Sequence, residues 1–231
     1  MAEARDESAI MQIVETADGS TTLFHPQVGE NYHSKHGALQ ESKHVFVQSG
    51  LAYLLQLYPL SSPVNILEVG FGTGLNYLMT ADYCIRHSID MHYTGIELFP
   101  VSKELILQLG NIRYASTEIG NEFLDIYETA QKHPIKTLHG SLSIKICDVA
   151  TCNIEESIDL LYFDAFAAVH QPEMWSHETL EHVCKYLKRG GVFVTYAITG
   201  NLKRTMKSLG FRIEKAPGAP GKREMLRAIK I

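Results

Sequence analysis

The sequence has no apolar run near the roughly 20 residues that a membrane-spanning helix needs. Its four cysteines, Cys84, Cys147, Cys152 and Cys184, form no CxxC pair, so we expect reduced, partly buried thiols. The first ten residues are polar and acidic and contain no signal-peptide core. Together these absences predict a cytoplasmic protein without a membrane segment.

A metal-binding pattern is also missing. The chain contains 11 histidines, but His170, His177 and His182 are spaced seven and five apart, which matches neither HExxH nor a zinc-finger pattern. The other histidines are equally irregular. We therefore expect no metal site and interpret the histidines as surface residues.

The chain lacks the overall positive charge of many nucleic-acid binders, because its net charge is -5. The charge is unevenly distributed, however. Residues 203–230 contain only two acids, Glu214 and Glu224, beside nine basic residues: Lys203, Arg204, Lys207, Arg212, Lys215, Lys222, Arg223, Arg227 and Lys230. A basic C-terminal end on an acidic body is compatible with a local phosphate-binding face.

Short apolar runs alternate with helical patterns from residue 63 onward. Strands are predicted at 64–69, 92–97, 143–147, 158–164 and 192–197, and helices at 76–87, 100–109, 118–132, 172–187 and 201–209. This alternation predicts an α/β fold with a mostly parallel sheet. Residues 211–215 and 224–231 flank a Gly/Pro loop, so a closing hairpin with an antiparallel strand is expected.

The N-terminal part has a different pattern. Two short strands are predicted around Asp18-Gly19, a good hairpin turn, and a helix follows near residues 45–56. We therefore expect residues 1–57 to form a small hairpin and helix extension. It would pack on a main Rossmann-like domain of residues 58–231.

A glycine loop, EVGFGTGLN at residues 68–76, follows the first strand of the predicted sheet. Gly70, Gly72 and Gly74 would let the backbone turn tightly and approach a ligand closely. Dinucleotide-binding loops have G-x-G-x-x-G spacing, whereas this loop has G-x-G-x-G and is preceded by Glu68. An acid there suits a cationic sulfonium ligand better than a pyrophosphate.

Acids also end the next three strands. Glu97 is placed to accept two ribose hydroxyls, although it can also be an exposed strand-end acid. Asp148, with Val149 beside it, is placed to meet an adenine amino group, or equally to cap a turn. Asp164 ends the fourth strand. The four acids together predict an S-adenosylmethionine site.

The predicted reaction is in-line transfer of the sulfonium methyl to an acceptor that the protein positions. Asp164 is our candidate to hold an acceptor amine and to receive its proton. Phe166 is the candidate to flank the acceptor. Trp175 either shields the site or packs in the core, and core packing is the stronger interpretation.

Five segments in order resemble a known family: NYHSKHGALQESKHVF, the glycine loop with TGIELFP, YFDAFA, PEMW and PGKREML. From about residue 32 to the C-terminus, the chain resembles the methyltransferase domain of the MnmC family of tRNA 5-methylaminomethyl-2-thiouridine biosynthesis proteins. The resemblance implies a class I S-adenosylmethionine-dependent methyltransferase fold, Rossmann-like, with a mostly parallel seven-stranded sheet. It also implies methylation of the primary amine of 5-aminomethyl-2-thiouridine at the tRNA wobble position.

The resemblance assigns roles to individual residues. The cofactor site would be lined by Gly70, Gly72, Gly74, Asn76, Glu97 and Asp148. Asp164 would face the methyl-transfer centre, and Lys222, Arg223 and Glu224 match the family's KRE segment. Lys203, Lys222 and Arg223 are our candidates for contact with tRNA near its anticodon.

Two departures from the family pattern matter. Its usual D-G-F-A-P appears here as D-A-F-A-A at residues 164–168, which alters the loop over the acceptor. The chain also lacks room for the FAD-dependent oxidoreductase domain of two-domain members. A stand-alone methyltransferase is therefore expected, with its amine substrate supplied by a separate enzyme.

Two other functions are compatible with the sequence. A small-molecule amine methyltransferase or aminopropyltransferase would have a deep, narrow acceptor pocket, whereas an RNA enzyme would have an open shelf flanked by aromatics. A non-enzymatic cofactor-binding or RNA-binding module is disfavoured, because the glycine loop and all four acids are intact.

Overall fold

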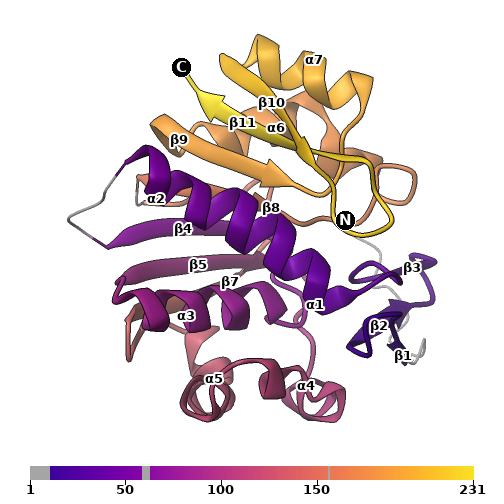
Figure 1. The fold of residues 1–231 in the computed structure, drawn as a ribbon, viewed down its shortest axis with the longest axis vertical. Coiled ribbons are helices and arrows are strands. Elements are labelled where there is room, and N and C mark those ends of the chain that lie inside the picture. Colours follow the sequence, from indigo (N-terminus) through magenta and orange to yellow (C-terminus); the bar gives the residue numbers. More distant parts are fainter. Residues whose placement is uncertain (1–10, 59–62, 156) are drawn as a thin grey trace.

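The structure, a computed structural model, describes residues 11–58, 63–155 and 157–231. Its centre is an eight-stranded sheet in the order β10-β11-β9-β8-β4-β5-β7-β6 (Figure 1). The strands are β4 (Val64–Val69), β5 (Met91–Glu97), β6 (Ile135–Thr137), β7 (Gly140–Ile146), β8 (Ile158–Phe163), β9 (Leu187–Thr195), β10 (Phe211–Pro217) and β11 (Glu224–Lys230). The middle of the sheet holds β8, which is buried along its whole length, and β4, which is buried except at Asn65, as their apolar runs predict.

The predicted fold class is confirmed. Strands β7, β5, β4, β8 and β9 are adjacent in this order and parallel to one another, and β11 lies antiparallel between β9 and β10. One strand was not predicted: β6 has three residues and pairs antiparallel with β7 at the sheet edge. It is too short to show an alternating pattern in the sequence.

Helices cover both faces of the sheet and bury a separate apolar core on each (Figure 1). One face carries a continuous helix of α1 (Ala38–Glu41), the π-helical stretch η1 (Ser42–Ala52) and α2 (Tyr53–Leu57), together with α3 (Leu75–His87), α4 (Lys103–Leu109), η2 (Asn111–Tyr114) and α5 (Thr117–Ala130). The other carries η3 (Pro172–Trp175), α6 (His177–Cys184) and α7 (Gly200–Ser208). This three-layer arrangement leaves the carboxyl ends of the strands for a ligand.

The predicted helix at 172–187 is interrupted. Residues 172–175 form the 3₁₀ turn η3, and α6 begins after Ser176. The Ser176 hydroxyl accepts a hydrogen bond from the Thr179 amide, so it acts as an N-cap and starts a new helix. The interruption turns Trp175 toward the sheet.

A small antiparallel sheet precedes the main one, as expected for the N-terminal part. It consists of β1 (Gln12–Glu15), β2 (Thr21–His25) and β3 (Glu30–Asn31). The helix after it packs directly on the main sheet, with the Phe46 and Tyr162 rings 5.1 Å apart. We therefore propose that the smaller unit ends near residue 37 rather than at the predicted residue 57.

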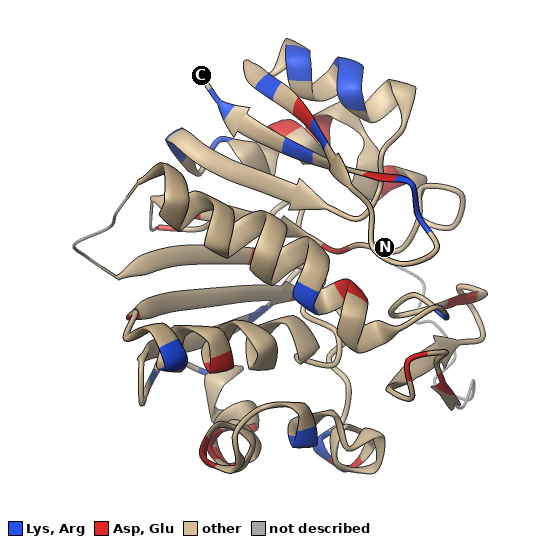
Figure 2. Cartoon of the chain, in the orientation of Figure 1, with Lys and Arg blue, Asp and Glu red and all other residues tan. Residues whose placement is uncertain are grey.

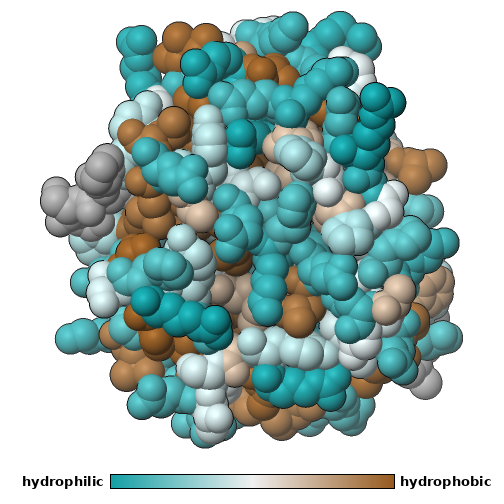
Figure 3. Space-filling model, in the orientation of Figure 1, coloured by the Kyte–Doolittle hydropathy of each residue, from teal (hydrophilic) through white to brown (hydrophobic). Residues whose placement is uncertain are grey.

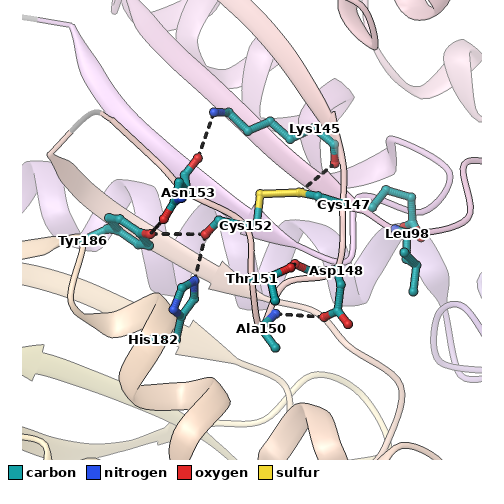
Figure 4. Close-up of a disulfide and its surroundings, with 11 residues drawn as sticks. Leu98, Lys145, Cys147, Asp148, Ala150, Thr151, Cys152, Asn153, His182 and Tyr186 are labelled. Carbon is teal, nitrogen blue, oxygen red and sulfur yellow. Dashed lines mark hydrogen bonds between the residues drawn. A yellow bond between two sulfur atoms is a disulfide. The ribbon is translucent and has the colours of Figure 1, made fainter. Parts of the chain in front are cut away.

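The expectation of four reduced cysteines was wrong for one pair. Cys147 and Cys152 form a disulfide (Figure 4). Cys84 and Cys184 are free and buried. The amides of Thr151 and Cys152 both donate to the Asp148 carbonyl, and this turn brings the two cysteine Cα atoms to 5.8 Å. The turn that allows the bond was not apparent from cysteine spacing.

Candidate active site

A cavity of about 270 Å³ lies beyond the carboxyl ends of β4, β5, β7 and β8. Four strand-end segments line it, and residues from the N-terminal unit and from the η3 region close it. The lining includes His25, Tyr32, Gly70, Gly72, Glu97, Leu98, Cys147, Asp148, Val149, Asp164, Phe166 and Met174. The structure therefore brings together most of the residues predicted from the sequence.

The glycine loop forms the floor of this cavity. Gly70 has φ +85°, and a Cβ there would lie 2.5 Å from the Asp164 carbonyl oxygen. Gly72 has φ +53°, and its Cβ would lie 3.0 Å from the Tyr32 ring. Glycine is thus required both by the left-handed backbone and by the close approach of β8 and Tyr32.

Glu97 is fixed by backbone groups at the end of β5. Its carboxylate accepts hydrogen bonds from the amides of Gly72 at 2.9 Å, Leu98 at 2.9 Å and Phe99 at 3.0 Å. Burial raises the pKa of Glu97, and these three bonds oppose the rise. The carboxylate is held at the cavity wall, where it can accept hydrogen bonds from hydroxyl groups of a ligand.

Asp148 and Val149 follow β7, the strand next to β5, and also line the cavity. Asp148 is exposed, and its carboxylate accepts the Ala150 amide at 2.9 Å, so it also caps a turn (Figure 4). Contact with an adenine amino group and capping of a turn, the two roles considered for Asp148, are both compatible with the structure. Apolar Leu98 and buried Val149 lie at the same wall, where a flat ring could pack.

Three residues predicted at the cofactor lie behind the cavity wall. Glu68 is fully buried and accepts hydrogen bonds from Asn76 and the Tyr93 hydroxyl, both at 2.8 Å. Gly74 packs against Phe123. Burial raises the pKa of Glu68 well above its usual value. We expect Glu68, Gly74 and Asn76 to shape the loop rather than to line the site.

Asn76 connects this buried layer to the proposed reaction centre. Its side-chain amide also donates to Asp164 at 2.8 Å, so one NH₂ group bridges two carboxyl groups. Its carbonyl oxygen is buried without a hydrogen-bond partner among the described residues. Asn76 therefore holds the side chain of Asp164 in place.

Asp164 has the most perturbed environment of the cavity acids. Burial raises its pKa to about 8, the Glu41 and Glu30 charges add to the rise, and the Asn76 hydrogen bond and the Lys222 charge oppose it. A carboxyl group that ionises near pH 8 can exchange a proton with an amine under physiological conditions. The catalytic role predicted for Asp164 is compatible with this environment and stays a prediction.

The loop after Asp164 is held at three places. The Ala167 amide donates to Glu30 at 2.8 Å, the Tyr196 hydroxyl donates to the Ala165 carbonyl at 3.0 Å, and the Trp175 indole donates to the Phe166 carbonyl at 2.8 Å. Trp175 also packs on the buried Phe163 ring at 5.0 Å. Trp175 is a core residue, as expected, and additionally positions the loop.

Replacing Trp175 with Phe should separate these two roles. The ring would still pack, but the hydrogen bond to Phe166 would be lost, costing about 1 kcal/mol of stability. We expect a lower kcat with a Kd for S-adenosylmethionine that changes less than about twofold, a factor worth 0.4 kcal/mol. Steady-state kinetics and calorimetry test this, and a proportional loss in both would place Trp175 at the cofactor.

Sequence reasoning missed the aromatic side chains opposite Phe166. Tyr32 lies edge-on to Phe166 with centroids 5.1 Å apart, and His25 lies 6.0 Å from Phe166. All three line the cavity. Only the family resemblance of the segment that contains Tyr32 pointed to this region. No local sequence pattern indicates that the N-terminal unit folds over the sheet.

A second, polar cavity of about 200 Å³ adjoins the first and shares Tyr32 and Phe166 with it. Lys222 reaches this cavity, donates to the buried Glu41 at 3.0 Å and lies 3.9 Å above the Tyr196 ring. Arg223 is exposed nearby in sequence, while Lys203 lines a separate hollow. The three predicted RNA contacts are thus in different environments.

Neither a metal centre nor a membrane segment is found among the described residues. No three His, Cys, Asp or Glu side chains gather there as metal ligands. No helix in that part of the chain is long and apolar enough to cross a membrane.

Comparisons with known proteins agree with this geometry. Residues 112–231 match the S-adenosyl-L-methionine-dependent methyltransferase family. The bifunctional tRNA 5-methylaminomethyl-2-thiouridine biosynthesis protein MnmC of Leptospira interrogans is 32% identical over 220 residues, which cover 91% of this chain and 34% of that protein. The Delftia acidovorans protein of the same name is 28% identical over 219 residues, 90% of this chain and 33% of its own. The chain spans about one third of these relatives.

Solved structures show the same fold. MNMC2 from Aquifex aeolicus superposes with a TM-score of 0.75 at 24% identity, covering 96% of this chain and 71% of that one. The sugar N-methyltransferase KedS8 from Streptoalloteichus has a TM-score of 0.51 at 11% identity, covering 100% and 98%. The fold, the glycine loop and the family match together show that this chain belongs to the S-adenosyl-L-methionine-dependent methyltransferases.

Proposed function

We propose that the chain methylates the primary amine of 5-aminomethyl-2-thiouridine, or its 2-oxo counterpart, at the tRNA wobble position. Asp164 carries the proposal, because its carboxyl group combines a pKa near 8 with an aromatic surround. The names of the bifunctional relatives support the choice of acceptor. The amine would come from a separate enzyme, and both enzymes would act in the cytoplasm.

The residues present fit S-adenosylmethionine. Glu97 and Asp148 offer carboxylates for ribose hydroxyls and an adenine amino group, and Leu98 and Val149 offer apolar contact. Gly70 and Gly72 let the loop approach Asp164 and Tyr32 more closely than a residue with a side chain could. When bound, the cofactor supplies an electrophilic methyl group on a sulfonium centre.

The protein's own contribution to catalysis would be to bind the acceptor, orient it and remove a proton from its amine. Asp164, held by Asn76, would accept a hydrogen bond from the amine and take its proton as the nitrogen forms its new bond. Tyr32 and Phe166 would flank the attached ring, since aromatic side chains receive an extruded base by stacking. The two aromatics border both cavities, so the acceptor would lie between them.

A small cationic amine is the alternative acceptor. Glu30 and Glu41 line the polar cavity, their charges reach Asp164 in the adjoining cavity, and they would attract any ammonium group. Such a substrate would need no contact with the outer surface of the protein.

One experiment distinguishes the two acceptors. Purified protein is incubated with methyl-labelled S-adenosylmethionine and bulk tRNA from a strain lacking the modification, and in parallel with free polyamines. Label at the wobble uridine supports the proposal. Label on free amines with none on tRNA overturns it in favour of the alternative.

Cofactor binding should also release a proton. A cation placed near Asp164 favours its charged form, so a pKa of about 8 would fall and the group would ionise at pH 7. Titration calorimetry in two buffers with different ionisation enthalpies measures the protons released. We expect a clear release from the natural chain and a smaller one from Asp164→Asn; equal release would assign the proton to another acid.

A further inference from the structure

A basic hollow lies on the outer surface of the fold, apart from both cavities. It has a volume of about 550 Å³ and is formed by α7 and β10. Its lining consists of Gly200, Lys203, Arg204, Lys207, Ile213 and Lys215, and it shares no residue with the cofactor cavity. Blue segments gather on α7 and the neighbouring strands in the upper part of Figure 2.

The charges in this hollow are largely unneutralised. Within the described part of the chain, Lys203, Arg204 and Lys207 make no ion pair, and Lys215 makes one long contact of 3.7 Å with Glu224. The α7 sequence, GNLKRTMKS, contains no acid. Like charges three and four residues apart repel each other on a helix, so an anionic partner would relieve this repulsion.

Lys222, by contrast, is a poor phosphate ligand. Its ammonium group is paired with Glu41 and covered by the Tyr196 ring. The charge of Lys222 is therefore neutralised within the protein, whereas the basic side chains of the hollow face outward.

The hollow lies close enough to Asp164 for one RNA strand to contact both. In the sheet order, β10 lies three strands from β8, which ends just before Asp164. With neighbouring strands about 4.8 Å apart, β10 and β8 are about 14 Å apart across the sheet. A few nucleotides of a stacked strand cover that distance, at about 3.4 Å each.

We infer that the hollow formed by α7 and β10 binds phosphate groups of the RNA backbone near the target nucleotide. This inference rests on the proposed function, because it assumes an RNA acceptor. Phosphate contacts of this kind position a substrate without reading its sequence.

A membrane surface fits less well. Leu202 and Met206, the apolar side chains of α7, are buried in the protein core, so the helix has no apolar face to insert into lipid. Hydrophilic side chains also dominate the face seen in Figure 3, with small and scattered apolar patches.

The test uses two double variants of equal charge change. Arg204→Glu with Lys207→Glu alters the hollow, whereas Lys132→Glu with Lys136→Glu alters exposed lysines near β6, at the opposite edge of the sheet. Binding of unmodified tRNA is measured by fluorescence anisotropy between about 50 and 200 mM salt. The Kd for S-adenosylmethionine, which both variants should retain, shows that each has folded.

The first variant should bind tRNA at least about tenfold more weakly, with a salt slope reduced by about two, and should raise KM rather than lower kcat. The second should bind within about twofold of the natural chain, a 0.4 kcal/mol difference. Arg204→Gln with Lys207→Gln should give an intermediate loss. Equal losses in both glutamate variants, or none in the first, would overturn the inference.

The outcomes also separate this inference from the proposed function. Binding through the hollow without methyl transfer would refute the acceptor and retain the surface. If the first variant methylates wobble uridine with an unchanged KM, the proposed acceptor is retained and the role of the hollow in RNA binding is refuted. Anionic phospholipid vesicles that bind the chain more tightly than tRNA does, in a manner lost in the first variant, would reassign the hollow to membranes.

Discussion

Replacing Asp164 with Asn is expected to lower kcat for methyl transfer by about 10²- to 10⁴-fold, the usual contribution of a positioned acid or base. The amide can still accept the Asn76 hydrogen bond but cannot take a proton from the amine. The Kd for S-adenosylmethionine should change far less. Equal losses in turnover and cofactor affinity would contradict the proposed role and make Asp164 a cofactor ligand only.

The same variant should be more stable than the natural chain at high pH. The pKa of Asp164 rises on folding from 3.8 to about 8, so the folded state holds a proton that the unfolded state releases. Through this group the natural chain loses stability as the pH rises from about 4 to 8, whereas the Asp164→Asn variant has no such loss. The gain in melting temperature should be larger at pH 9 than at pH 5, which thermal unfolding measures; an equal gain at both would contradict the shift.

Replacing Gly70 with Ala should nearly abolish cofactor binding. The new Cβ would lie 2.5 Å from the Asp164 carbonyl oxygen, and the backbone has φ +85°, so both a clash and conformational strain result. The strand end that carries Asp164 must move, and an error of about 1 Å in such a site can cost about 100-fold in rate. We expect both weak binding and slow turnover.

Gly210 provides a matched control for this substitution. It has φ +81°, close to that of Gly70, but a Cβ there meets nothing within 4 Å. Gly210→Ala should therefore lower stability through strain alone and leave the Kd for S-adenosylmethionine unchanged. If both variants bind the cofactor equally poorly, the close approach at Gly70 has no special role.

The sequence predicted the sheet and its ligand-binding edge because both depend on local patterns. Buried parallel strands are continuous apolar runs, and the acids that end them meet at one edge whatever the distances along the chain. Glu97, Asp148 and Asp164 all line the cavity for this reason. Strand β6 has too few residues to produce such a pattern.

The features that sequence reasoning missed depend on side-chain environment. The charge of Lys222 suggested an RNA contact, but only tertiary structure reveals its pairing with Glu41. Tyr32 carries no local signal, because its importance comes from the docking of the N-terminal unit against Phe166. Composition predicts where charge is abundant, and packing decides which charges are available to a partner.

The loop that carries Asp164 is tied to distant parts of the chain, which has a consequence for folding. Its contact with Glu30 spans 137 residues, and the adjoining pair of Glu41 and Lys222 spans 181. Contacts of such long range close late, because the chain must first lose the entropy of large loops. A folding intermediate that lacks these contacts would thus be inactive, and activity would appear only after the segments with Glu30, Glu41 and Lys222 had docked.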